Sequence, residues 1–127
     1  MSKKNVKKGE AKEGSGNRAQ AILRHARISP RKVRHVLDLV RGKQIEPALQ
    51  ILEFTPKKGA RMVAKLLKSA VANARDTKGL DADELWVTRA WANEGPIMKR
   101  YMPRARGSAD KIRKRSAHIT IEVGLKV

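Results

Sequence analysis

Hydrophobic residues in the first half of the chain recur at the spacing of a helix face. Ser29 and Pro30 form a typical helix start, and Gly42 forms a typical end. Between them, one face carries Val33, Val36, Leu37 and Val40. A shorter helix is expected next, beginning close to Pro47 and ending near Phe54. Its apolar positions are Ile45, Leu49 and Leu52.

The third expected helix has the most regular pattern. Thr55 and Pro56 repeat the Ser-Pro start signal, and Gly79 marks the end. Its apolar face consists of Val63, Leu66, Leu67, Ala70, Val71 and Ala74. Each of the three segments therefore has one face to bury against the rest of the fold.

Towards the end of the chain the hydrophobic pattern changes to a period of two. Residues 118–127, HITIEVGLKV, alternate strictly, and their apolar face consists of Ile119, Ile121, Val123, Leu125 and Val127. Residues 85–93, LWVTRAWAN, are typical of a strand, and the run from Ala21 to Ile28 predicts a third strand. Trp86 and Trp91 are five residues apart, which predicts opposite faces of the strand, with Trp86 in the core.

The segment between the two later strands is strongly basic. If these strands pair antiparallel, about residues 94–117 extend them into a long hairpin, which we call the arm. An extension of ten residues per strand projects about 30 Å. Between Pro96 and Ser116, Asp110 is the only acid, against Lys99, Arg100, Arg104, Arg106, Lys111, Arg113, Lys114 and Arg115. Such a segment repels itself unless phosphates neutralise it, although a solvated basic loop is the simpler alternative.

Composition supports a nucleic-acid partner. The 127 residues suit one domain, residues 19–127, and carry 30 basic and 12 acidic side chains, for a net charge of +18. Residues 1–18 form a basic tail, expected to be disordered when free, that either solubilises the protein or orders on RNA. No apolar run reaches the ~20 residues of a membrane span, and no secretory signal begins the chain, so a cytoplasmic protein without a membrane partner is expected.

Catalytic chemistry is not expected. Cysteine is absent, and His25, His35 and His118 fall on different elements without the spacing of metal ligands. Neither a glycine-rich phosphate loop nor a calcium loop is present. The sequence therefore predicts no enzyme, no metal and no cofactor. Aromatic residues make up only 3% of the chain, which argues against a base-stacking platform and favours contacts with phosphates.

Three separated runs carry a family resemblance: ISPRKVRHVLDLVRG, MVAKLLKSAVANA and GPIMKRYMPRARGSADKIRKRSAHITIEV. In order and spacing they resemble the bacterial large-subunit ribosomal protein twenty-two, from about Ala19 to Val127. The resemblance implies an α+β fold of three helices packed on a small three-stranded antiparallel sheet, with a long protruding basic β-hairpin. It also implies a structural constituent of the large ribosomal subunit that binds several domains of its RNA, helps their assembly and lines the nascent-peptide exit tunnel.

The resemblance assigns expected roles to individual residues. From the basic pattern, residues expected to bind ribosomal RNA are Arg31, Lys32, Arg34, Lys99, Arg100, Arg104, Arg106, Lys111, Arg113, Lys114 and Arg115. Residues that match the tunnel-lining stretch are Met98, Lys99, Arg100, Arg104, Ala105, Arg106, Gly107 and Ala109. Of these, Met98–Arg100 match the stretch linked in the family to macrolide response. Ser108 stands where relatives usually carry Arg, which removes one charge from the tip.

The implied partners are large-subunit ribosomal RNA, neighbouring ribosomal proteins and, near the tip of the arm, nascent peptides and macrolides. A homo-oligomer is not expected, because the chain has no excess of hydrophobic residues. An architectural DNA-bending protein is the main alternative, since such proteins also carry basic β-arms, although on a short dimeric body. A nuclease or RNA-modifying enzyme is disfavoured by the missing acid pair or histidine cluster.

Overall fold

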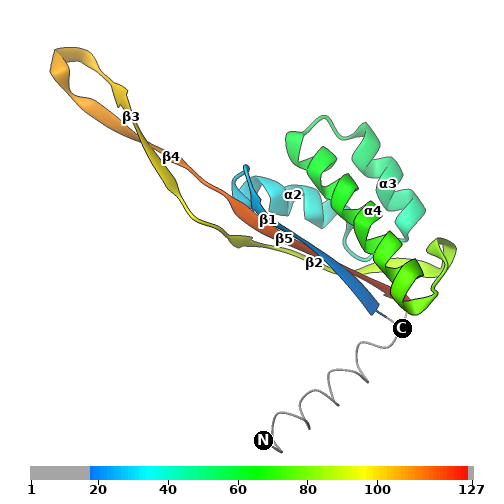
Figure 1. Ribbon diagram of the computed structural model, residues 1–127. Helices are drawn as coiled ribbons and strands as arrows, with labels where there is room; N and C mark the ends of the chain where they lie inside the picture. The colour runs from blue at the N-terminus through cyan, green and yellow to red at the C-terminus, as the bar shows by residue number, and fades with distance from the viewer. Residues whose placement is uncertain (1–17, 126–127) are drawn as a thin grey trace, which may run out of the picture.

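The computed structural model describes residues 18–125, in which three helices lie on one face of a three-stranded sheet (Figure 1). The elements are β1 (Arg18–Ala26), α2 (Pro30–Val40), α3 (Ile45–Phe54), α4 (Lys58–Lys78), the 3₁₀ turn η1 (Ala82–Glu84), β2 (Leu85–Glu94), β3 (Met98–Pro103), the 3₁₀ turn η2 (Ala105–Gly107), β4 (Ala109–Lys114) and β5 (Ala117–Leu125). The sheet has the order β1-β5-β2, with both pairs antiparallel. The expected α+β fold is therefore confirmed. The expected tail lies outside the described residues, apart from Arg18, which begins β1.

The core lies between the helices and the sheet. The apolar face expected for α2 is fully buried, as are the central positions of β5: Val33, Val36, Leu37, Val40, Ile119, Ile121 and Val123. On α4, Val63, Leu66, Leu67, Ala70 and Ala74 are buried, whereas Val71 is only partly covered. β5 is the central strand, with β1 and β2 paired along its two edges. Even on the face of β5 that points away from the helices, Thr120 is therefore only 6% exposed. Helical periodicity thus predicted this core well.

The helix ends follow the sequence signals with one correction. α2 begins at Pro30, as expected, and α4 ends at Gly79, whose φ of 63° lets its N–H bond to Arg75 O at 3.1 Å. Thr55, however, does not start α4, which begins at Lys58. The Thr55 hydroxyl donates instead to Ile51 O at 2.6 Å and closes the end of α3. The Thr-Pro signal therefore marks the turn between the two helices.

The prediction for the two tryptophans was wrong. A β-bulge shifts the register of β2 against β5 between Val87 and Arg89. Trp86 consequently pairs with Gly124 and Trp91 with Thr120, so both side chains lie on the same face of the sheet. That face is opposite the buried side chains of the core, and both tryptophans are half-buried rather than part of the core.

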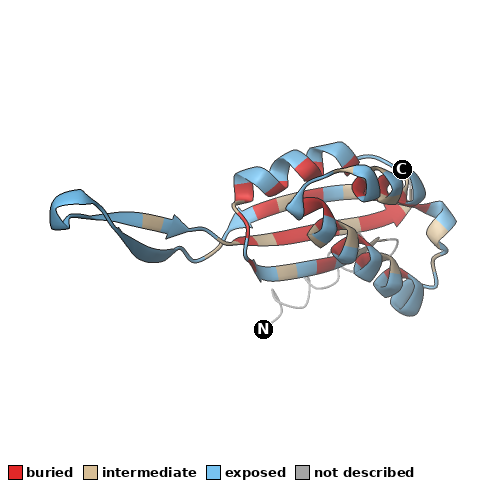
Figure 2. Cartoon of the chain, turned by 90° about the horizontal axis from the view of Figure 1, so that it is seen from above, coloured by how far each residue is buried: buried red, intermediate tan, exposed pale blue. Residues whose placement is uncertain are grey.

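The arm projects from the end of the sheet as a separate two-stranded ribbon of β3 and β4 (Figures 1 and 2). At its base the Gly95 N–H donates to Ser116 O at 2.9 Å, and the Ser116 hydroxyl donates to Pro96 O at 2.6 Å. Figure 2 shows the ribbon exposed along its length, and none of the described residues 97–115 is buried. The arm is therefore held by strand pairing alone, without a core.

Candidate nucleic-acid interface

Strand register divides the arm into two faces. Residues directly opposite in an antiparallel pair point to the same side, and the side alternates along each strand. One face carries Lys99, Tyr101 and Pro103 from β3 with Arg113, Lys111 and Ala109 from β4. The other carries Met98, Arg100 and Met102 with Lys114, Ile112 and Asp110. The first face is cationic, and the second mixes charge with flexible apolar side chains.

Like charges face each other on the cationic side. Lys99 lies opposite Arg113, and Lys111 lies opposite Tyr101, whose ring is 66% exposed. Like charges directly across a strand pair destabilise it by a few tenths of a kcal/mol or more. Phosphates between such side chains would turn that repulsion into attraction. The arm thus places its cations where a polyanion stabilises the hairpin. The exposure of Tyr101 was not anticipated from the sequence.

The tip of the arm is a structured turn. The Arg104 N–H donates to Ser108 O at 2.7 Å, and the Ser108 hydroxyl donates to Ala105 O at 2.9 Å. Arg106 and Gly107 both have positive φ, at 62° and 71°. Ser108, which the family resemblance predicts to remove one charge from the tip, therefore closes the turn with its side chain. The tunnel-lining candidates Ala105, Arg106 and Gly107 are all exposed there.

Asp110, the single acid between Pro96 and Ser116, already has a partner. Arg104 Nε lies 2.9 Å from Asp110 Oδ2, an ion pair whose side chains are 59% and 64% exposed. Such a pair contributes at most about 1 kcal/mol, because water and salt screen it. It nevertheless holds the Arg104 side chain beside Asp110 and offsets the charge of that carboxylate.

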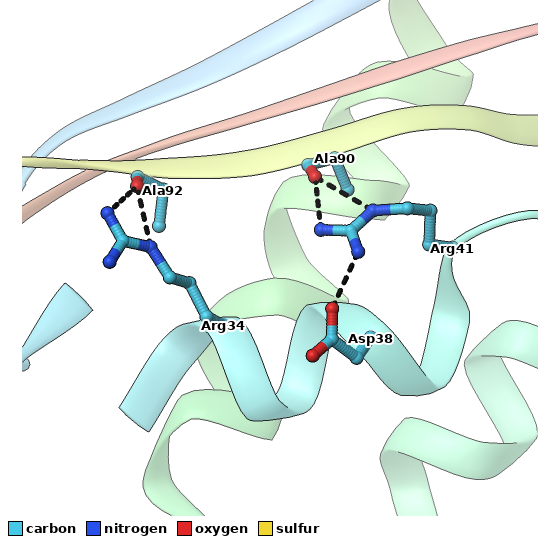
Figure 3. A network of polar contacts seen from close by, with 5 residues as sticks. All are labelled: Arg34, Asp38, Arg41, Ala90 and Ala92. Carbon is cyan, nitrogen blue, oxygen red and sulfur yellow. Dashed lines mark hydrogen bonds and ion pairs between the residues drawn. The ribbon is translucent and has the colours of Figure 1, made fainter. Parts of the chain in front are cut away.

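Arg34 of α2 and Arg41, which directly follows α2, are directed to the sheet and not to solvent (Figure 3). Arg34 donates from Nε and Nη2 to Ala92 O at 3.2 and 2.9 Å, and Arg41 donates from Nε and Nη2 to Ala90 O at 3.1 and 2.7 Å. Arg41 also pairs with Asp38 at 2.6 Å. Because β2 is an edge strand, its outer backbone carbonyls could otherwise pair with another chain. The two guanidinium groups donate hydrogen bonds to these carbonyls instead.

The remaining cations expected on this helix behave differently. Arg31 and Lys32 are exposed, and within residues 18–125 neither makes a hydrogen bond or an ion pair. Of the three candidates on α2, two are therefore available to a partner. Arg34 already donates its Nε–H and one Nη2–H to β2, so only its remaining guanidinium N–H groups are available.

The histidines form no metal site among residues 18–125. The structure does bring together two that the sequence placed on different elements. The His25 N–H donates to His118 Nδ1 at 3.1 Å, and the two rings meet edge to face with centroids 4.9 Å apart. This contact ties the end of β1, where His25 adopts a φ of 57°, to the start of β5 at the base of the arm. Its role is structural.

None of the helices in the described part of the chain is long and apolar enough to cross a membrane. The family model described as "Ribosomal protein L22p/L17e" matches residues 21–124. A protein named large ribosomal subunit protein uL22 from Acetivibrio thermocellus is 58% identical over 118 residues, which cover 91% of this chain and 94% of that protein. One of the same name from a Thermoanaerobacter species is 59% identical over 105 residues, covering 83% and 95%. This chain therefore belongs to the ribosomal protein L22p/L17e family.

Proposed function

We propose that this protein is a structural constituent of the large ribosomal subunit that binds several domains of its RNA and helps them assemble. Its family consists of ribosomal proteins, which are components of a ribonucleoprotein and not enzymes. Association with ribosomal RNA and with neighbouring ribosomal proteins follows from that membership. Within the proposal, the body of helices and sheet fixes the position of the protein, and the arm reaches into the RNA.

The observation that carries the proposal is the arm itself. Eight cations lie on a ribbon with no buried side chain among the described residues 97–115, and two of them face each other across the strands. A ribbon two strands wide is thin enough to pass between RNA helices, because neighbouring strands are only about 5 Å apart. The proposed phosphate contacts are Lys99, Arg100, Arg104, Arg106, Lys111, Arg113, Lys114 and Arg115.

On α2 the proposed RNA contacts are Arg31 and Lys32, whose side chains are exposed and without partners in residues 18–125. Arg34 contributes to RNA binding only through the N–H groups that do not bind Ala92 O, which are those of Nη1 and the second N–H of Nη2. In the proposal these side chains contact a second RNA segment, away from the tip of the arm. Two separated contacts on one rigid chain would hold two RNA domains together.

We further propose that the tip of the arm lines the nascent-peptide tunnel. The supporting features are the closed turn at Arg104–Ser108 and the exposure of its side chains. The tunnel-lining residues would be Met98, Lys99, Arg100, Arg104, Ala105, Arg106, Gly107 and Ala109, where nascent peptides and macrolides would come close. The face with Met98 and Met102 offers apolar surface for such contacts, and both side chains are more than two-fifths exposed.

The direct test is the salt dependence of binding to large-subunit ribosomal RNA. Replacing Arg113, Lys114 and Arg115 by Ala should weaken binding and flatten the slope of log K against log salt by roughly two units. A matched variant removes three cations from α4 instead, with Lys65, Arg75 and Lys78 replaced by Ala. An unchanged slope in the arm variant would show that these residues do not contact phosphates and would contradict the proposal.

A further inference from the structure

An aromatic ring stands in solvent at the end of α3. Phe54 is 82% exposed, more than any other large apolar side chain in residues 18–125. On one side of it lies a shallow apolar groove of about 490 Å³, lined by Pro47, Gln50, Ile51 and Thr55. On the other side lies a larger groove of about 920 Å³ between α3 and α4. Because Phe54 lines both grooves, a partner bound there would bury this ring, and burial of so large an apolar side chain is favourable.

The larger groove is cationic. Its charged lining consists of Glu53, Lys57, Lys58, Arg61 and Lys68, four cations against one acid. Lys58 is fixed by a hydrogen bond from Nζ to Arg27 O at 3.2 Å. The side chains of the other three cations make no hydrogen bond or ion pair with any residue that the structure describes. The groove therefore combines unpaired positive charge with an exposed ring.

The cations are spaced along the axis of α4. Lys57 precedes its first turn, Arg61 follows one turn later, and Lys68 lies about two turns further, a row of about 16 Å at 1.5 Å per residue. The first turn contains no acidic residue, so the positive end of the helix dipole adds to this charge. A row of that length is suited to an extended polyanion and too long for a single small anion.

We propose that this groove binds a single-stranded segment of ribosomal RNA, with one unstacked base on the Phe54 ring and the flanking phosphates on Lys57, Arg61 and Lys68. The inference rests on the proposed function, because it takes ribosomal RNA as the partner. An apolar ring beside a row of cations is the combination that single-stranded RNA recognition uses. A protein partner would need several acids to match the same row. Although aromatic residues are rare in this chain, one ring is enough for one base.

The ring is tested with two variants of the full chain, using natural large-subunit ribosomal RNA as the probe. Phe54→Leu keeps an apolar side chain but removes the stacking surface, and should weaken binding about tenfold. Phe54→Tyr keeps the ring and should bind within about twofold of the parent, since the added hydroxyl remains in solvent. Because Phe54 is exposed, neither change should lower the melting temperature. Equal affinity of the parent and Phe54→Leu would overturn the proposal.

The cations are tested with two matched triple variants, each of which removes two lysines and one arginine from α4 or from its N-cap. Replacing Lys57, Arg61 and Lys68 by Gln should flatten the salt slope by about two units, because about 0.7 unit is lost per phosphate contact with a single strand. The control replaces Lys65, Arg75 and Lys78 by Gln, which removes two lysines and one arginine outside the groove. Equal effects of the two variants would mean that only overall charge matters, and would overturn the site.

A photo-reactive p-benzoylphenylalanine at position 54 distinguishes the class of partner in assembled ribosomes. Crosslinks from this position to a short stretch of ribosomal RNA are expected. Crosslinks to a ribosomal protein would overturn the inference and assign the groove to a protein neighbour. If the arm variant weakens RNA binding while the groove variants do not, this inference alone fails. If the unmodified protein does not bind the RNA, the proposed function fails as well.

Discussion

The body and the arm are built on opposite principles. In the body, helix faces and strand faces pack into one core, with Leu37, Leu67 and Ile121 fully buried. In the arm, none of the described residues 97–115 is buried, and cations face cations across the strands. An isolated two-stranded hairpin is marginally stable in water, whereas a packed layer of helices on a sheet is stable. We therefore expect the order of the body to be intrinsic and the order of the arm to depend on a partner.

The largest effect should come from the core. Leu67→Ala removes a side chain that is completely buried between α4 and its neighbours, and should lower the free energy of unfolding by roughly 2–5 kcal/mol. The matched change in the arm, Met102→Ala, should alter it by less than about 0.5 kcal/mol. Urea titration measures both. If Met102→Ala destabilised the protein as much as Leu67→Ala, the arm would belong to the cooperative core.

A smaller loss of stability should distinguish the basic residues of α2 and the adjoining Arg41 that bind the sheet from those that face solvent. Arg34→Met and Arg41→Met keep the aliphatic stems but leave Ala92 O and Ala90 O without their charged donors, at a cost of about 1 kcal/mol each. Arg31→Met and Lys32→Met should leave the melting temperature unchanged and weaken RNA binding. Thermal unfolding measures the stability of both double variants, and titration with RNA measures their affinity. Equal stabilities of the two double variants would show that the guanidinium forks do not stabilise the body.

The smallest effect is expected at the junction of the two regions. A Cβ on Gly95 would lie 2.5 Å from Ser116 Oγ and 3.3 Å from the Ser116 backbone, so Gly95→Ala should crowd the base of the arm. The expected cost is about 1 kcal/mol, because the exposed junction can shift. Protease cleavage within the arm should accelerate, and adding Ser116→Ala should restore part of the resistance. Cleavage at the parental rate would show that this contact does not position the arm.

Local patterns in the sequence predicted most of the body and the charge of the arm. Hydrophobic periodicity predicted the helix face with Val33 and Val40 and the strand face with Ile119 and Val123. It could do so because it depends only on neighbours along the chain. The arm was predictable because its charge excludes a core. The expected RNA and tunnel contacts of its individual residues stay predictions.

Features that depend on pairing between distant segments were not predictable in this way. The bulge after Val87 exists only in the register of β2 against β5, and it places both tryptophans on one face. Arg34 was expected to be a further exposed cation, because no local signal reveals that β2 is an edge strand beside α2. The exposure of Phe54 was likewise not anticipated, since the sequence indicated only that the helix ends near this residue.

The most direct test of the comparison is amide hydrogen exchange of the full protein, free and bound to large-subunit ribosomal RNA. The account predicts that amides of β5 exchange slowly in both states, whereas amides of β3 and β4 exchange rapidly in the free protein and become protected on binding. Slow exchange of β3 and β4 in the free protein, or no added protection in the complex, would contradict an arm that depends on RNA for its order.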